Sequence, residues 1–182
     1  MNPSRSSTPA GGPDVPDQAT HRGLYTADER RRRDASVWTR VQGALAPLQF
    51  LVFLVSLALV WRTLATGEGA GAATASVVVK TLVLYTIMIT GAIWERDVFG
   101  QFLFARPFFW EDVFSMLVLA LHTAYLACVF AGWLDVRGQL YLALAAYAAY
   151  VINAAQFLVK FRQARLGAAP RRGAADAIEA AP

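Results

Sequence analysis

Residues 44–63 read ALAPLQFLVFLVSLALVWRT, twenty residues whose single charged side chain stands next to the end. A bilayer core about 30 Å thick is crossed by about 20 helical residues. Three more apolar stretches of this kind follow, at residues 72–94, 109–132 and 139–161. The connections between them are short, which favours an up-down-up-down arrangement. We therefore predict an all-α fold, a polytopic membrane protein built as a four-transmembrane-helix bundle.

The composition agrees with this prediction and limits the chemistry. Of 182 residues, 56% are hydrophobic, 16% are charged, and the mean hydropathy is +0.38. The first 43 residues are polar and Arg-rich, without the apolar core of a signal peptide, so we expect the first span to be a retained anchor. Cys128 is the single cysteine, which excludes an internal disulfide and a cysteine-based metal site.

The distribution of Lys and Arg predicts the orientation. Fourteen of these residues fall before the first span, between the second and third, or toward the C-terminal end, and only Arg62 and Arg137 fall in the other two loops. Basic residues accumulate on the cytoplasmic side, so both termini are expected to be cytoplasmic. The net charge of +4 then reflects topology and contact with anionic headgroups. No nucleic-acid-binding module is present, and we expect no nucleic-acid partner.

The sequence divides into four segments of different character. We predict a disordered N-terminal tail at 1–25, a basic interfacial helix at 26–43, the membrane domain at 44–162, and a disordered C-terminal tail at 163–182. Thr26 and Glu29 have capping-box spacing, which predicts where the interfacial helix begins. Trp38 suits the headgroup zone.

The loop between the second and third spans is both charged and aromatic. Its sequence, ERDVFGQFLFARPFF at 95–109, leads into Trp110. One interpretation is an ordinary aromatic belt at the membrane interface. The other is a flat apolar lip for a large planar ligand, with Gly100 and Pro107 turning the chain.

Polar residues recur at helical spacing inside the spans. Read at about 100° per residue, each span has a polar stripe on one face. Polar groups avoid lipid, so the stripes should converge inside the bundle and form a cavity that opens toward the cytoplasm. The candidate substrate-binding residues on these stripes are Gln49, Lys80, Ser115, Tyr125, Asn153 and Gln156.

Several of these residues also have a purely structural interpretation. Asn and Gln often join transmembrane helices. Glu95 and Glu111 stand at span ends, where water or a neighbouring arginine would satisfy them. Asp112 points about 100° away from Glu111 and is expected to be an interface charge. Lys80 is expected to snorkel outward along its long stem.

His122 is the one histidine within a span. It can be a metal ligand, an acid-base group, or a buried neutral histidine bonded to a hydroxyl. Bis-histidine haem needs two embedded histidines, and one histidine with scattered carboxylates makes no convincing transition-metal site. The sequence also lacks CxxCH, HExxH and a glycine-rich phosphate loop.

Four long runs resemble a known family. They are DERRRRDASVWTRVQGALAPLQFLVFLVSLALV, VVKTLVLYTIMITGAIWERDVFGQFLF, FFWEDVFSMLVLALHTAYL and LALAAYAAYVINAAQFLVK, within residues 28–162. Together they closely resemble the 3-vinyl (bacterio)chlorophyllide hydratases of photosynthetic bacteria. The resemblance implies a hydro-lyase of bacteriochlorophyll synthesis that needs no cofactor and adds water to the 3-vinyl group of a magnesium pigment, giving 3-(1-hydroxyethyl). It also implies a bacterial inner membrane and neighbouring pigment-synthesis enzymes as partners, and it carries over no residue roles.

This chemistry can be matched to residues independently. Hydration of a vinyl group needs a proton donor, a group that orients water, and a field that stabilises the cation. Glu95 and Glu111 flank one short loop, so we predict that they share a site as the proton-transfer pair. His122 lies about 16 Å along the helix from Glu111 and is either a ligand to the magnesium of the pigment or the acid-base group itself. The alternative function is a pigment-binding or assembly scaffold, which needs no proton donor.

Overall fold

The fold is described from a computed structural model, which covers the backbone of residues 24–179 and the side chains of residues 24–163. Over these residues every element is helical: α1 (Ala27–Ala35), α2 (Val37–Thr66), α3 (Ala70–Phe99), the 3-10 turn η2 (Arg106–Phe108), α4 (Phe109–Ala131) and α5 (Val136–Glu179). The four long helices are apolar and long enough to cross a membrane. The predicted all-α, four-span fold is therefore confirmed, and the cytoplasmic placement of the termini stays a prediction.

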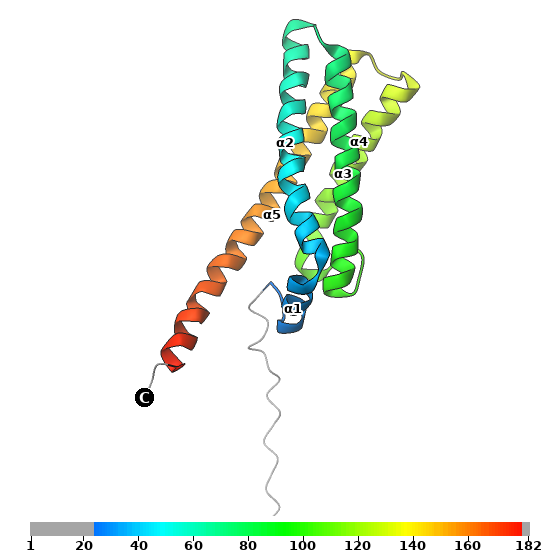
Figure 1. The fold of residues 1–182 in the computed structure, drawn as a ribbon. Coiled ribbons are helices and arrows are strands. Elements are labelled where there is room, and N and C mark those ends of the chain that lie inside the picture. Colours follow the sequence, from blue (N-terminus) through cyan, green and yellow to red (C-terminus); the bar gives the residue numbers. More distant parts are fainter. Residues whose placement is uncertain (1–23, 180–182) are drawn as a thin grey trace, which may run out of the picture.

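The helices begin and end where the local sequence specifies. Thr26 and Glu29 form the predicted capping box at the start of α1. Gly67, Gly100 and Gly132 end α2, α3 and α4 in the left-handed conformation, which glycine adopts without steric cost. The chain thus reverses direction within a few residues after each of these helices. In Figure 1 α2 runs beside α3, while α5 passes behind them and extends beyond the bundle.

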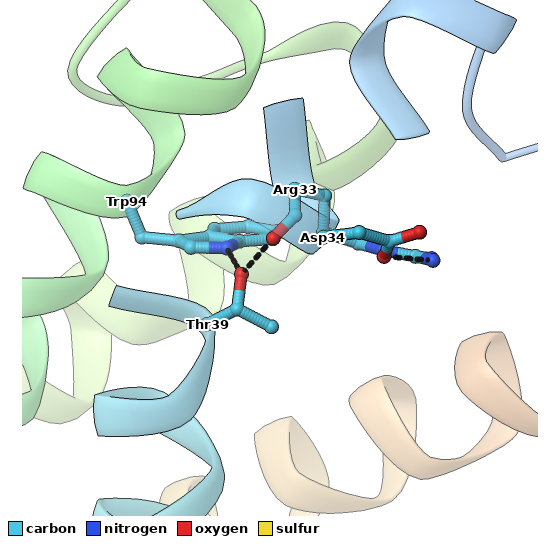
Figure 2. A network of polar contacts seen from close by, with 4 residues as sticks. All are labelled: Arg33, Asp34, Thr39 and Trp94. Atoms are coloured by element: carbon cyan, nitrogen blue, oxygen red, sulfur yellow. Dashed lines mark hydrogen bonds and ion pairs between the residues drawn. The ribbon is translucent and has the colours of Figure 1, made fainter. Parts of the chain in front are cut away.

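The interfacial helix predicted at 26–43 is wrong in its extent. The chain breaks at Ser36, whose hydroxyl caps the next helix by accepting from the N–H of Trp38, so residues 37–43 belong to α2. Figure 2 shows how the break is held: the Thr39 hydroxyl donates to the Arg33 carbonyl at 2.6 Å and accepts from the Trp94 indole at 2.9 Å. Ser36 also donates to Asp97 on α3. A short α1 is thereby fixed across the end of the bundle.

The C-terminal segment also differs from its prediction. The backbone of residues 163–179 continues α5 as a helix, where the sequence analysis predicts disorder. Alanine recurs through this segment and has the highest helix propensity. The predicted N-terminal tail lies outside the described residues up to residue 23.

The polar stripes converge inside the bundle as predicted. Buried polar residues include Gln49, Lys80, Glu95, Glu111, Ser115, His122 and Asn153. Large apolar side chains such as Trp61, Phe130 and Leu158 are exposed on the outside of the helices. This inside-out distribution is expected of a protein whose solvent is lipid.

Candidate active site

A groove of about 500 Å³ lies between Glu111 at the start of α4 and residues 152–163 of α5. The start of α4 lies at the same end of the bundle as α1 (Figure 1). The groove is lined by Glu111, Ile152, Ala155, Gln156, Val159, Lys160 and Gln163. Gln156, Lys160 and Gln163 follow i, i+4, i+7 spacing on α5, so they form one stripe of polar side chains along a mostly apolar wall. Such a groove suits a flat apolar ligand with a few polar contacts.

Glu111 and Lys160 form an ion pair in this groove. The Lys160 ammonium lies 2.5 Å from a carboxylate oxygen of Glu111 and also donates to the Pro107 carbonyl. The Glu111 side chain is mostly buried, and Lys160 is about one quarter exposed. Lys160 is not among the site residues predicted from the sequence, although helical spacing places it on the same face of α5 as Gln156. Among the described residues that line the groove, Lys160 is the one cation.

About one helical turn further into the bundle lies a buried polar layer of three side chains that do not line the groove, Gln49, Ser115 and Asn153. Asn153 donates to the Ser115 hydroxyl at 2.8 Å, which joins α5 to α4. Gln49, only 2% exposed, has no hydrogen-bond partner for either side-chain polar atom. The side-chain carbonyl oxygens of Asn153 and Gln156 also lack partners.

A second buried layer lies further from the groove and contains Lys80 and His122, both fully buried. The Lys80 ammonium lies 4.0 Å from the centre of the Tyr150 ring, with no hydrogen-bond acceptor. The expectation that Lys80 snorkels outward is therefore wrong, because its stem points into the bundle and its end is covered by α5. His122 donates from Nδ1 to the Val118 carbonyl at 2.8 Å, and its Nε2 has no partner.

Tyr125 and Tyr147 complete this deeper layer. Tyr125 is fully buried and stands three residues after His122, on the same face of α4. The Tyr147 ring lies 5.9 Å from the His122 ring, and its hydroxyl bonds Ser56 at 2.5 Å. Leu84, Val118 and Ala149 form an apolar cluster between the two polar layers. Within the described residues, no group of three or more His, Cys, Asp or Glu side chains could hold a metal ion.

Glu95 faces Asp112 and not Glu111. The predicted pairing of Glu95 with Glu111 is therefore not found. The side chains of Glu95 and Asp112 are buried and hydrogen-bonded to each other. A bond between two carboxyl groups requires a proton on one of them, since carboxylates carry only acceptors. The assignment of Asp112 as an interface charge is thus wrong. Its position on α4 turns it toward α3 while Glu111 turns toward α5.

The same carboxyl pair holds the loop between α3 and α4. Glu95 accepts from the N–H of Ala105 at 3.2 Å, and Asp112 accepts from the N–H of Phe104 at 2.7 Å. Phe104 has a φ of 59°, which is unfavourable for a residue with a side chain. These two bonds therefore stabilise a strained turn that covers the pair.

The aromatic loop divides into two parts. Phe108 is buried against Tyr25, Trp94, Phe99, Phe157 and Phe161. Phe102, Phe104, Phe109 and Trp110 are exposed. The buried part joins α1 to the bundle, and the exposed part is the portion available to a membrane interface or to a planar ligand. Both interpretations of the loop stay open for its exposed residues, and neither describes the buried Phe108 cluster.

The comparisons with known proteins decide the family. A family model described as 2-vinyl bacteriochlorophyllide hydratase matches residues 25–163. This chain belongs to the 2-vinyl bacteriochlorophyllide hydratase family. This is the family that the sequence resembles.

Two relatives in the hydratase family support this membership over nearly their whole length. A 2-vinyl bacteriochlorophyllide hydratase of Rhodobacter capsulatus is 64% identical over 157 residues, covering 86% of this chain and 91% of the relative. Another, of Cereibacter sphaeroides, is 66% identical over 149 residues, covering 81% and 92%. No solved structure matches the chain. The family match includes the groove, both polar layers and the Glu95–Asp112 pair.

Proposed function

We propose that this chain is a hydro-lyase that adds water to the vinyl group of chlorophyllide a or vinyl bacteriochlorophyllide, in bacteriochlorophyll synthesis. The observation that supports it most directly is the family membership, with relatives about 65% identical that carry this name. We further propose that the reaction needs no cofactor, and that the magnesium belongs to the pigment. The proposed location is the bacterial inner membrane, beside other pigment-synthesis enzymes.

The pigment binds in the groove between α4 and α5. This groove opens on the outside of the helices, where a pigment dissolved in the bilayer can enter, and its walls are largely apolar. Gln156 and Lys160 supply hydrogen-bond donors along one wall. Lys80, His122 and Tyr125 are also proposed contacts, and a pigment would reach them only by displacing the apolar cluster of Leu84, Val118 and Ala149.

Glu111 and Lys160 transfer the proton. Lys160 holds the proton in the ion pair and passes it to Glu111, which delivers it to the terminal vinyl carbon. The positive charge that forms on the inner carbon is spread into the macrocycle. The Glu111 carboxylate then stabilises this cation electrostatically. Water adds to the inner carbon, loses a proton to Glu111, and leaves the 1-hydroxyethyl product. Glu95, through its bond to Asp112, is the proposed proton reserve behind Glu111.

The test is a reaction with purified protein and chlorophyllide. We expect a product heavier by one water without a nucleotide or redox cofactor. Glu111→Gln keeps the size of the side chain but removes the acid, so turnover should fall by about 10²–10⁴-fold while pigment still binds. Glu68→Gln, in the exposed loop after α2, is the matched control and should leave turnover unchanged. Pigment binding without conversion by the wild-type chain would instead support the scaffold function.

A further inference from the structure

We infer that Gln49, Ser115 and Asn153 bind the water molecule that is added to the vinyl group. This inference rests on the proposed function and assigns the second substrate of the same site. Gln49 and Asn153 have buried polar atoms without a protein partner, and Asn153 donates to Ser115. Buried polar atoms in native proteins almost always have partners, either protein atoms or ordered water.

Gln49 is the clearest exception to this rule. Its amide nitrogen and its carbonyl oxygen are both buried and both lack a protein partner. Gln42, seven residues earlier on the same helix, differs because its amide donates to the Thr90 hydroxyl at 2.8 Å. A glutamine that only joins helices would be expected to resemble Gln42. Gln49 offers a donor and an acceptor to a small polar ligand.

Gln49 and Asn153 lie at the same level of the bundle. Phe53 on α2 contacts Tyr150 on α5, with ring centres 4.9 Å apart. From this contact, Gln49 lies about 6 Å and Asn153 about 4.5 Å along their antiparallel helices, both toward the groove end. Each lies three or four residues from the contact and so continues the same helical face. The unpartnered oxygen of Asn153 and the unpartnered amide of Gln49 thus belong to one layer.

The layer adjoins the proton-transfer pair. Ser115 follows Glu111 by four residues, or about 6 Å along α4, on the same face. Asn153 precedes Gln156 of the groove by three residues in the same way. Lys80 and His122, by contrast, are separated from the groove by the cluster of Leu84, Val118 and Ala149. A water bound at Gln49 and Asn153 would therefore lie about one helical turn from Glu111, toward the interior of the bundle.

Addition across the double bond would use both groups, Glu111 at the terminal carbon and the bound water at the inner carbon. A proton goes from Glu111 to the terminal carbon, the oxygen of the bound water forms a bond to the inner carbon, and one proton of that water returns to Glu111. The atoms of one water are added and nothing is oxidised or reduced. An amide donor and an amide acceptor orient the oxygen toward the carbon without competing for the proton.

Competition between water and methanol tests this site. Methanol adds by the same steps and gives a 1-methoxyethyl pigment, which mass spectrometry separates from the hydroxyethyl product. A site fitted to water should exclude the methyl group, so the wild-type chain in dilute methanol should form mainly the hydrated pigment. Gln49→Ala and Asn153→Ala remove a ligand and add room, so we expect the ratio of methoxy to hydroxy product to rise at least about tenfold.

Gln42→Ala is the matched control and should keep the wild-type ratio. If the alanine variants do not fold, Gln49→Asn and Asn153→Ser, which shorten the side chain and stay polar, should still raise the ratio. An unchanged ratio in folded variants at both positions would overturn the water site and leave the hydratase function intact. Formation of neither product by the wild-type chain would overturn the proposed function, and the water site with it.

Discussion

Glu111 and Asp112 are neighbours in the sequence that serve different polar pairs. Consecutive helical residues point about 100° apart, so Glu111 turns to Lys160 on α5 and Asp112 turns to Glu95 on α3. One carboxylate faces an open groove and the other is closed beneath the α3–α4 loop. Their roles in proton transfer should differ accordingly.

The Glu95–Asp112 pair can be tested at the level of single atoms. Asp112→Asn keeps an oxygen for the N–H of Phe104 and gains a donor for Glu95, so the loop should stay bound and thermal stability should change little. If the pair resupplies the proton of Glu111, Asp112→Asn and Glu95→Gln should both lower turnover, though by less than Glu111→Gln. Turnover and melting temperature are measured on the same samples. Wild-type turnover in both variants would show that the pair only stabilises the loop and takes no part in proton transfer.

A separate prediction concerns His122 as a ligand to the magnesium of the pigment. Its Nε2 has no protein partner, and imidazole is a common metal ligand. If it binds the magnesium, the wild-type chain should bind a metal-free pigment more weakly, and His122→Ala should lose much of that preference. Titration of both pigments by absorbance measures this. A His122→Ala variant that binds both pigments like wild type but hydrates neither would show that His122 is an acid-base group.

At the scale of elements, α1 is joined to the bundle by Tyr25. Its ring stacks on Phe99 with centres 5.8 Å apart, and the Arg33 guanidinium lies 4.8 Å from the ring centre. Burial raises the pKa of Tyr25 from 10.0 to about 12, although Arg33 opposes this. The neutral phenol is thus the form that packs.

The stability that this contact contributes should depend on pH. Because the pKa is higher in the folded chain than in the unfolded one, the contribution is complete below pH 10 and is lost as the pH rises to about 12. Two units correspond to about 2–3 kcal/mol. The melting temperature of the wild type should therefore fall between pH 9 and pH 11.5 by more than that of Tyr25→Phe, which keeps the ring and lacks the ionisable group. Equal falls would contradict the assignment.

For the whole molecule, the open prediction is orientation. Fourteen basic residues fall on one side of the four spans and two on the other, so both termini should be cytoplasmic. Reporter fusions within residues 67–69 and 132–135, the two turns away from α1, should report the periplasmic side. A cytoplasmic signal from both turns would show the opposite orientation of the spans, and the groove beside Glu111 would then open away from the cytoplasm. A cytoplasmic signal from one turn alone would also contradict the predicted orientation.

The sequence by itself determined the four spans, the capping box at Thr26 and the polar stripe along each span. These features depend on local composition and helical spacing, which any helix of that sequence must express. The family also followed from the sequence, because long stretches of this chain resemble the sequences of the hydratases.

Only the tertiary structure decided which polar groups meet. Spacing gives the face of one helix, while the partner of that face depends on how helices rotate and cross. Glu95 therefore bonds Asp112, Glu111 bonds Lys160, and Lys80 points inward although a long stem would allow it to reach the interface. The break at Ser36 likewise depends on contacts with Asp97 and Trp94 on α3, which lie about 60 residues away in the chain.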